Sequence, residues 1–358
     1  MHKDKTIAIV CNYALNPNRI GGMDRFFVAY DKKLKELGYQ VHWYFSSYKE
    51  PIQFFEGLTI FSAESSSVES FFINNLNEKN RSYNILVTHF IALCTSFFKE
   101  AKKNGIQKTI AVDHNPRPLV GFSLKKRMKN KLKGIIYSKY IDLFVGVSVY
   151  TKKCILKDYG FFLNKKTMVI YNGIDTSVFK KRTQEHKNKF IVTSHLRYSK
   201  GIQDLLIAVS QLPSNIKNTI QIDVFGEGPY ENELKSICTQ LNLTSSIHFK
   251  GSSANLNVLF ANYSYMIQPT YMECFSLSIL ESLASNVPVI TTTVGGNLEV
   301  ITHNKNGFIF EPGNVNELKV LLERIILGEL KISNETNFLI ESEFNLEKMV
   351  DNHLIYIQ

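Results

Sequence analysis

Residues 263–292 read YSYMIQPTYMECFSLSILESLASNVPVITT and place two apolar runs on either side of an amphipathic segment. The first run, YSYMIQP, and the last, VPVITT, have the length of strands and contain aromatic or β-branched residues. Between them, FSLSILESLAS predicts a helix that Ser276 or Ser278 caps at its start and that Asn286 follows at its end. A strand, a helix and a strand in this order predict a parallel β-α-β unit.

The same alternation of short apolar runs and amphipathic segments continues through the 358-residue chain, a length that favours two domains over one. Further strands are predicted at 6–11, 40–46, 84–90, 109–114, 141–148, 167–172, 190–195, 220–225, 247–251 and 307–312. Further helices are predicted at 23–39, 92–104, 201–212, 229–241 and 254–262. Strands spaced by helices imply parallel sheets with both faces covered, so the predicted fold class is α/β.

One polar segment, GIDTSVFKKRTQEHKN at residues 173–188, interrupts this alternation and carries no hydrophobic period. We therefore expect a linker there. It would separate a first domain at 1–172 from a second domain at 189–342. The remaining residues, from about 343 to 358, are expected to form a helix that packs back on the first domain.

Charge and cysteine content narrow the class of protein. The 42 Lys and Arg residues exceed the 32 Asp and Glu residues, and the resulting net charge of +10 suits an anionic partner. The five cysteines are scattered and form no C-x-x-C pair, which argues for a reduced compartment and against a disulfide framework or a structural zinc site. The apolar runs are only of strand length, and the run at 6–11 is too short for a signal-peptide core, so we expect a cytoplasmic protein.

Two acids, Glu273 and Glu281, stand in the opening stretch with seven residues between them. In open α/β domains, ligands bind beyond the carboxyl ends of the strands, where helix N-termini present N–H groups to anions. Glu273 precedes the predicted helix and Glu281 lies roughly 7–8 Å along it, so the two carboxylates would flank an anion at the helix start and bind neighbouring hydroxyl groups. Alternatively, Glu281 is a solvated helix residue and Glu273 an ordinary loop acid.

Two cations, Arg197 and Lys200, lie in VTSHLRYSKGIQDLLIA, between the first strand and the first helix of the second domain. Such a pair beside a helix N-terminus suits a diphosphate, because an arginine grips its oxygens with paired donors and a lysine adds a point charge. A merely exposed basic turn is the alternative.

Two pairs of glycines precede predicted helices. Gly226 and Gly228 follow a strand in DVFGEGPYENEL, but Glu231 occupies the third glycine position of a dinucleotide fingerprint, which disfavours NAD. These two glycines mark either a tight turn or a close approach of the backbone to a ligand. Gly21 and Gly22 stand before the first predicted helix, where backbone N–H groups can face an anion, although a flexible turn accounts for them equally well.

Two histidines end predicted strands of the first domain, His89 in VTHF and His114 in VDHNPRP. Both should lie at the ligand-binding rim of the sheet. We interpret His89 as a structural residue and keep His114 as a candidate site residue.

The segment SLKKRMKNKLKGIIYSKY, residues 123–140, interleaves seven Lys and Arg residues with Leu, Met and Ile. It suits the surface of an anionic bilayer, where lysine stems and apolar side chains settle into the headgroup layer. A solvated basic helix is the alternative. Nucleic acid is disfavoured as a partner because no recognition motif accompanies the segment.

Taken in order along the chain, these motifs resemble family 4 of the glycosyltransferases, a large group of retaining enzymes with the GT-B fold. The resemblance covers nearly the whole chain and is strongest from 142 to 326. ECFSLSILE, ASNVPVITTTVGGNLEVI and NGFIFEPGNVNEL resemble the C-terminal signature of the family, and the E-x7-E spacing in that context is specific. GVSVYTKKCI and VIYNGIDTSVF resemble its central segments, and GGMDRF resembles its G-G-x-E-R loop with Asp24 in the place of Glu.

The GT-B fold implies two Rossmann-like domains with parallel sheets that face each other across a cleft. The resemblance implies that the second domain holds a nucleotide-sugar donor and that the first domain binds the acceptor. Glu281 would bind the ribose hydroxyls and Glu273 those of the donor sugar, while Lys200 and Arg197 would neutralise the diphosphate leaving group. The remaining residues implied to contact sugar or phosphate are His114, Gly21, Gly22, Gly226, Gly228, Phe275, Ser276 and Leu277.

The chain departs from the family pattern in its basic loop. The family usually has G-R-L before a K-G pair, with the Arg five residues ahead of the Lys, whereas here His195 stands in that place and Arg197 is displaced by two. Lys200 is therefore the firmer leaving-group contact, and either His195 or Arg197 is the second one. No metal is implied, since the chain has no Asp-x-Asp motif, and no cofactor is implied apart from the nucleotide sugar as co-substrate.

The implied activity is metal-independent transfer of a hexose, with retained anomeric configuration, from a UDP-sugar rather than a GDP-sugar. The acceptor would be a glycan or a lipid-linked glycan in bacterial surface-polysaccharide biosynthesis, with residues 123–140 as a peripheral contact to the inner face of the plasma membrane. The displaced arginine favours the alternative of a non-catalytic nucleotide-sugar binder or a regulatory partner of an active transferase. A GT-B epimerase or phosphorylase is a further alternative, which the first domain supports little.

Overall fold

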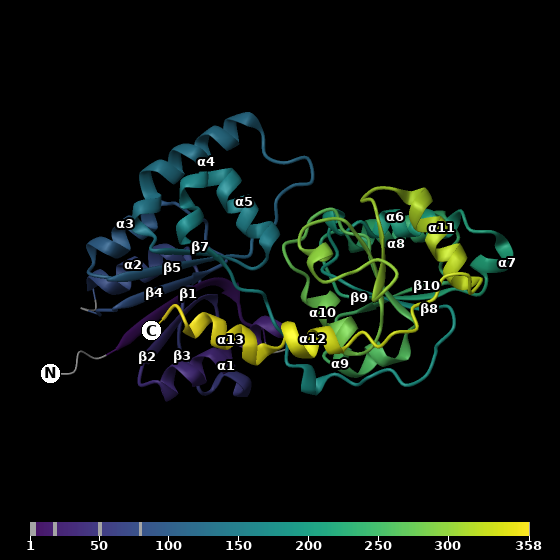
Figure 1. Ribbon diagram of the computed structural model, residues 1–358, viewed down its shortest axis with the longest axis horizontal. Coiled ribbons are helices and arrows are strands. Elements are labelled where there is room, and N and C mark those ends of the chain that lie inside the picture. The colour runs from purple at the N-terminus through teal and green to yellow at the C-terminus, as the bar shows by residue number, and fades with distance from the viewer. Residues whose placement is uncertain (1–4, 17–19, 49–51, 79–80, 358) are drawn as a thin grey trace. The chain divides into compact units, whose positions relative to one another are not determined.

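The computed structural model describes residues 5–16, 20–48, 52–78 and 81–357. The chain forms two compact α/β units (Figure 1). The first unit comprises residues 1–172 together with 346–358, and the second comprises residues 173–345. Each unit is built on one parallel sheet, so the predicted α/β class is confirmed.

The first unit contains a seven-stranded parallel sheet in the order β3-β2-β1-β4-β5-β6-β7. Its strands are β1 (Thr6–Ala14), β2 (Gln40–Ser47), β3 (Thr59–Ser62), β4 (Ile85–His89), β5 (Lys108–Asp113), β6 (Leu143–Gly146) and β7 (Thr167–Val169). The strand order reverses between β1 and β4, so the carboxyl ends of these two strands form the topological switch point of the sheet.

Helices cover both faces of this sheet: α1 (Gly22–Glu36) and α13 (Leu346–Leu354) lie on one face, and α2 (Val68–Glu78), α3 (Ser96–Lys103), α4 (Leu124–Tyr137) and α5 (Val149–Tyr159) lie on the other (Figure 1). The two-residue period of β2 shows the division. The Tyr44 ring lies 4.9 Å from that of Phe72 in α2, whereas Trp43 and Phe45 lie 5.2 and 5.4 Å from Phe27 in α1. Successive side chains of a strand point to opposite faces, so one aromatic strand supplies both cores.

The second unit contains a six-stranded parallel sheet in the order β10-β9-β8-β11-β12-β13. Its strands are β8 (Lys189–Thr193), β9 (Gln221–Phe225), β10 (Ile247–Gly251), β11 (Tyr265–Gln268), β12 (Val289–Thr292) and β13 (Gly307–Phe310). Here the order reverses between β8 and β11, which places the switch point at the carboxyl ends of those strands.

The helices of the second unit are α6 (Ile202–Ser210), α7 (Ser214–Lys217), α8 (Glu231–Gln240), α9 (Leu256–Leu259), α10 (Leu277–Ala284), α11 (Val315–Ile326) and α12 (Phe338–Glu343). In Figure 1, α6, α8 and α11 lie on one face of the sheet, and α9, α10 and α12 lie on the other. One core joins Val192, Val224 and Ile267 of the strands to Leu206 of α6 and Leu322 of α11, all fully or almost fully buried.

The opening stretch folds as its pattern predicted, with α10 between β11 and β12. Of the two serines proposed as its cap, Ser276 is the N-cap, because its Oγ accepts a hydrogen bond from Ile279 N at 3.3 Å. Asn286 has a φ of +58°, the left-handed conformation that commonly ends a helix. Both capping predictions are confirmed.

Several element lengths differ from prediction. The helix predicted at 254–262 is a single turn, α9, followed by a 3-10 turn at Phe260–Asn262, since its three asparagines are poor helix formers. The helix predicted at 92–104 begins only at Ser96, because Cys94 has a φ of +53° that a helix cannot include. Strand β3 and helix α2 were not predicted, and a four-residue edge strand is too short to show a period.

Residues 173–188 form part of the second unit. The backbone N–H groups of Lys180 and Arg182 donate to Asn257 O at 2.9 Å and Ser285 O at 2.8 Å, respectively. The Arg182 guanidinium also donates to Ser264 O at 2.7 Å. Polar bonds thus hold the segment on the unit, which explains why it needs no hydrophobic period.

Candidate active site

The switch point of the second sheet brings two loops together. β8 and β11 are neighbours, and the loops at their carboxyl ends, 194–201 and 269–276, lead to helices on opposite faces. Ser199 O joins the loops, accepting hydrogen bonds from Tyr271 N at 2.8 Å and from Thr270 Oγ1 at 3.2 Å. Open α/β sheets bind ligands at this position.

Lys200 and Glu273, one from each loop, form an ion pair at the switch point. Lys200 Nζ lies 2.9 Å from Glu273 Oε2, and Oε1 accepts a hydrogen bond from Cys274 N at 3.1 Å. The two side chains are 23% and 17% exposed, so solvent reaches the pair although most of its surface is covered. The structure therefore joins two candidate catalytic residues that are 73 positions apart in the chain.

Gly201 fixes the position of Lys200. Its φ is +68°, and a Cβ at this residue would lie 1.8 Å from the carbonyl oxygen of Pro269. No side chain fits there, so only glycine allows the basic loop to run directly against the loop that carries Glu273.

A partly buried polar cluster that joins α6 to these loops was not predicted. The phenol of Tyr271 donates to Asp204 Oδ2 at 2.5 Å, and Gln203 Nε2 donates to Tyr271 Oη at 3.2 Å and to Tyr198 O at 3.2 Å. Burial and the adjacent Asp204 carboxylate raise the pKa of Tyr271, so its hydroxyl remains a donor. The cluster ties α6 to both loops. No local pattern marks it, since its members come from two separate segments.

The N-terminus of α10 lies on the loop that carries Glu273. Ser276 Oγ, besides capping the helix, accepts a hydrogen bond from Gln268 Nε2 at 2.7 Å, and Gln268 is the buried last residue of β11. Leu277 is the first residue of the helix. The backbone N–H groups at a helix start point away from the helix and favour an anion. The hydrogen bond between Gln268 and Ser276 thus connects the end of β11 to the start of α10. It fixes the direction in which the N–H groups at the helix start point.

Phe275 and Glu281 flank that helix start in different environments. Phe275 is buried with its ring 5.4 Å from that of Phe344, so only its backbone can face a ligand. Glu281 is half-buried in the second turn of α10. The structure therefore places Glu281 on the helix and Glu273 ahead of it, the order that the E-x7-E spacing predicted.

Gly226 and Gly228 lie against the protein's own backbone. A Cβ at Gly226, whose φ is +121°, would lie 1.9 Å from Ser194 O, and one at Gly228 would lie 2.3 Å from Leu196 O. Leu196 N donates to Glu227 O at 2.9 Å, so the two segments run side by side. The sequence indicated a tight turn or a close approach to a ligand, and the close approach in the structure is to the loop that carries the candidate basic residues.

His195 and Arg197, the two alternative partners of a diphosphate, are both exposed in this loop. Within the described part of the chain, the Arg197 guanidinium makes no hydrogen bond or ion pair, although its backbone carbonyl accepts a hydrogen bond from Lys200 N at 2.9 Å. Unlike Lys200, it is not held in one position by the fold.

In the first unit, Gly21 is the N-cap of α1 and Gly22 its first residue. The carboxylate of Asp24 accepts hydrogen bonds from Gly21 N at 2.7 Å and from Tyr13 Oη at 3.1 Å. Asp24 is fully buried. This acid thus fastens the glycine loop to the end of β1, at the switch point of the first sheet.

His114 and His89 lie at the carboxyl ends of β5 and β4. His89 Nδ1 lies 3.0 Å from His114 Nε2, and the ring of Phe90 stacks on His114 at a centroid distance of 4.2 Å. Burial, with a contribution from the neighbouring His353, lowers the pKa of His114 to about 3, so the imidazole is neutral at pH 7. His89 is fully buried among aromatic rings, in agreement with a structural residue.

A second buried network, not predicted, holds the chain beside His114. Arg117 pairs with Asp113 and Asp158, each at 2.8 Å, and both acids are buried. Asn115 N donates to Asp113 Oδ1 at 3.0 Å. Because both neighbours of His114 are bonded to this network, the position of its ring depends on it.

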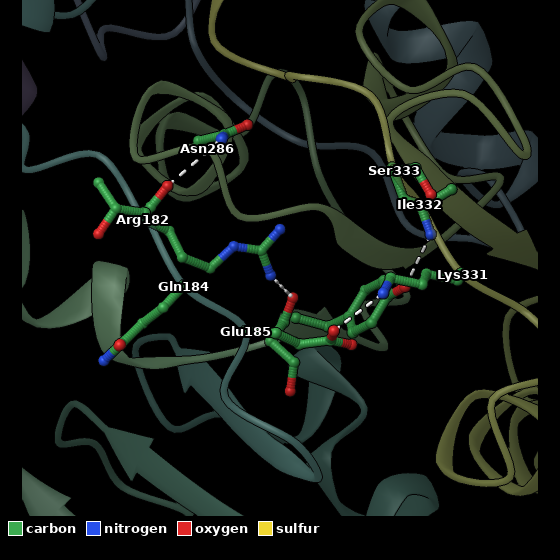
Figure 2. Close-up of a pocket in the computed structure, with 10 residues that line it drawn as sticks. Arg182, Gln184, Glu185, Asn286, Lys331, Ile332 and Ser333 are labelled. Carbon is green, nitrogen blue, oxygen red and sulfur yellow. Dashed lines mark hydrogen bonds and ion pairs between the residues drawn. The ribbon is translucent and has the colours of Figure 1, made fainter.

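A cavity of about 330 Å³ lies elsewhere in the second unit, and Figure 2 shows its polar lining. It includes Tyr265, the first residue of β11, so it opens at the amino ends of the strands, opposite the switch point. Lys331 and Glu185 pair across it at 2.8 Å. We therefore do not assign the active site to it. In the described residues, three or more His, Cys, Asp or Glu side chains nowhere gather closely enough to hold a metal ion.

Two parallel α/β units, each with its switch point at the carboxyl ends of two central strands, place the protein in the GT-B class of folds. The crystal structure of HepE from Anabaena in complex with UDP and glucose has a TM-score of 0.79 to this chain, with 17% identity over 99% of both chains. At that identity the likeness concerns the fold.

The family follows from sequence. The pattern of Glycosyltransferase Family 4 matches residues 20–178, and that of Glycosyl transferases group 1 matches residues 173–341. Together the two matches cover residues 20–341, so the chain belongs to glycosyltransferase family 4, the group 1 glycosyl transferases.

Characterised relatives match part of the chain. N-acetyl-alpha-D-glucosaminyl L-malate synthase of Bacillus anthracis is 30% identical over 167 residues, 42% of each protein. Lipopolysaccharide 1,6-galactosyltransferase of Escherichia coli K12 is 26% identical over 176 residues, 47% of this chain and 48% of the relative. The chain spans about half the length of the curated relatives it matches.

Proposed function

We propose that the protein is a retaining, metal-independent glycosyltransferase that moves a hexose from a UDP-sugar to a glycan or lipid-linked glycan in the cytoplasm. Family membership supports the reaction class. The observation that carries the assignment to a site is the ion pair between Lys200 and Glu273 at the switch point of the second sheet, beside the N-terminus of α10.

In this proposal, a nucleoside diphosphate binds between Lys200 and the start of α10. Both favour negative charge, the lysine through its ammonium group and the helix through its N–H groups and dipole. Glu281, farther along α10, binds the ribose hydroxyls. Glu273 binds hydroxyl groups of the sugar, so its contact with Lys200 keeps the sugar-binding and phosphate-binding groups adjacent, as a sugar–diphosphate bond requires.

The reaction breaks the bond between the anomeric carbon and the diphosphate oxygen, and the electron pair stays on that oxygen. Lys200 and the helix N-terminus stabilise the charge that develops there. The acceptor oxygen forms the new bond on the same face of the sugar, and its proton passes to the leaving phosphate oxygen. This proton transfer requires no protein base.

The choice of UDP and of a surface glycan rests on the relatives. HepE was crystallised with UDP and glucose, and the Escherichia coli relative is named for transfer of galactose to lipopolysaccharide. These names concern those proteins, and we extend to this chain only the nucleotide and the broad acceptor class.

The proposal is tested with UDP-glucose, UDP-galactose, UDP-N-acetylglucosamine and GDP-mannose. We expect thermal stabilisation by UDP but not by GDP, slow hydrolysis of one UDP-sugar, and early release of a sugar with the donor's anomeric configuration in proton NMR. Lys235→Ala, which removes the partly exposed Lys235–Glu231 pair on α8, is the control for Lys200→Ala, which removes the Lys200–Glu273 pair. Release of the inverted sugar, or stabilisation by GDP alone, would contradict the assignment.

A non-catalytic nucleotide-sugar binder is the second candidate. The displaced Arg197, whose side chain has no partner among the described residues, favours it, because a leaving-group contact that the fold does not orient contributes less to catalysis. Stabilisation by a UDP-sugar without hydrolysis, even when glycan acceptors are added, would favour this candidate over the enzyme.

A further inference from the structure

Helix α4 of the first unit turns its apolar side chains to solvent. Leu124, Met128, Leu132, Ile135 and Ile136 are each between 44% and 74% exposed. At about 100° per residue, these five fall within an arc of about 120°, which we call the α4 stripe. A helix of a globular protein normally faces such a stripe toward the core. Here the stripe is directed away from it.

The side of α4 that packs on the unit carries small and polar residues instead. Asn130 and Gly134 are its buried residues. A Cβ at Gly134 would lie 2.0 Å from the carbonyl oxygen of Tyr159, so α4 rests directly on the end of α5. Close backbone contact therefore holds the helix in place and leaves the α4 stripe uncovered.

Other apolar residues are exposed next to the helix. Phe161 and Phe162, just after α5, are 71% and 60% exposed, and Lys131 Nζ of α4 lies 5.8 Å from the Phe161 ring. Leu119 and Val120, in the loop that leads into α4, are exposed as well. The apolar surface thus extends beyond a single helix. Patches of this kind mark interaction sites.

The charge around the α4 stripe has one sign. Residues 114–141 contain eight Lys and Arg residues and no Asp or Glu. By the same count of 100° per residue, Arg127 and Lys131 border one edge of the stripe and Lys129 borders the other. Burial and two neighbouring lysines lower the pKa of Lys133, a sign that the cations repel one another and would gain from an anionic surface.

We propose that the α4 stripe and its bordering cations bind the surface of an anionic lipid bilayer. Apolar side chains flanked on both edges by long cationic ones match the headgroup layer, where stripe residues enter the acyl boundary and lysines reach the phosphates. A nucleic acid would use the cations but not the stripe. Among the described residues, no helix combines the length and apolar composition needed to cross a bilayer. The proposal goes beyond the transferase reaction and needs no donor to be tested.

The first test is co-sedimentation of the full chain with two kinds of vesicle. One consists of phosphatidylcholine alone, and the other also contains about 30 mol% of the anionic lipid phosphatidylglycerol. We expect binding to the phosphatidylglycerol vesicles that falls roughly tenfold or more between about 0.05 and 0.5 M NaCl, since surface charge is screened over that range. Equal binding to both vesicle types, or none to either, would overturn the proposal.

The second test separates the stripe from the charge. A triple variant removes the stripe at constant charge and combines Leu124→Ser, Met128→Ser and Leu132→Ser. Its vesicle partition coefficient should be at least tenfold lower. A double variant removes charge and combines Lys125→Gln with Lys129→Gln, and its binding should be weaker mainly at low salt. Matched controls are Val320→Ser with Leu327→Ser, exposed apolar residues at α11, and Lys32→Gln with Lys33→Gln on α1, which covers the opposite sheet face.

All of these positions are exposed, so thermal unfolding and UDP-sugar hydrolysis should be unchanged in each variant. Full vesicle binding by the triple serine variant would refute the role of the stripe. Two other occupants are checked with the same proteins. A dimer in vesicle-free analytical ultracentrifugation that the triple variant abolishes, or single-stranded RNA that displaces the vesicles, would assign the surface to a second copy or to nucleic acid instead.

Discussion

Lys200 and Glu273 meet at 2.9 Å because β8 and β11 are neighbours in the second sheet, although β9 and β10 lie between them in the chain. The pair is the point at which the two loops of the switch point present opposite charges to solvent. A diphosphate that approached Lys200 would either share the Lys200 ammonium group with Glu273 or displace the Glu273 carboxylate from it. The Lys200–Glu273 pair is therefore both a structural link and the most specific feature of the candidate active site.

Substitution of Lys200 should affect catalysis far more than stability. For Lys200→Ala we expect kcat/KM with the active UDP-sugar to fall by roughly 10²–10³-fold, the usual effect of removing one group that stabilises developing charge. The unfolding free energy should fall by only about 1 kcal/mol, since a partly exposed ion pair contributes little. Steady-state kinetics and urea unfolding measure the two. Lys235→Ala is the control, and equal activity in both variants would remove Lys200 from the site.

Substitution of Glu281 should act on binding. A carboxylate that holds the ribose contacts a part of the donor that does not react, so the contact is equal in the ground state and the transition state. For Glu281→Ala we expect KM for the donor to rise by roughly 10–100-fold with kcat nearly unchanged, from loss of hydrogen bonds to a charged group. Glu323→Ala, on α11, is the matched helix variant. A fall in kcat at constant KM would contradict the ribose role.

Gly201→Ala should destabilise the second unit. The substitution combines a left-handed backbone with a Cβ 1.8 Å from Pro269 O, so one of the two loops must move, at a cost of about 2–5 kcal/mol. Gly313→Ala separates the two effects, because Gly313 has a φ of +81° with nothing within 4 Å of its Cβ and should cost only about 1–2 kcal/mol. Urea unfolding compares the variants. Equal losses would show that the contact with Pro269 is not restrictive.

Stability should fall on acidification below about pH 6.5. His114 and His353 each have a pKa lowered to about 3 by burial, whereas the unfolded chain has histidine pKa values of about 6.5. Between these values the unfolded state binds more protons, so unfolding becomes easier as pH falls, by at most about 1.4 kcal/mol per pH unit for each histidine. Thermal unfolding at pH 7.5 and 5.0 tests this. His353→Gln should flatten the dependence, and an unchanged slope would show that His353 is not the source.

Local pattern correctly predicted where the candidate site residues lie on strand, loop and helix when that placement depends on neighbours in the chain. The cap at Ser276, the left-handed Asn286, and the positions of Glu273 and Glu281 relative to α10 follow from spacing within one β-α-β unit. Hydrophobic period and capping residues act over a few positions, so they can be recognised without the fold. The basic loop was likewise expected at the carboxyl end of β8, where the structure has it.

Other features depend on strand order and could not be predicted. Three contacts join segments that are distant in the chain: Lys200 with Glu273, Gly226 with Ser194, and Tyr271 with Asp204. No periodicity encodes which loops meet at a switch point.

Helix α4 also shows what local sequence can predict and what it cannot. Its apolar and basic residues alternate with a helical period, which is compatible with a buried face or an exposed one. Gly134, by allowing α4 to rest on the Tyr159 carbonyl, settles that the α4 stripe faces solvent. Residue order was therefore enough for the α/β class, the β11–α10–β12 unit with its helix caps, and the family. The partners of its charged residues and the exposed side of α4 followed only from packing, because long-range contacts are set by the arrangement of whole elements and not by their local composition.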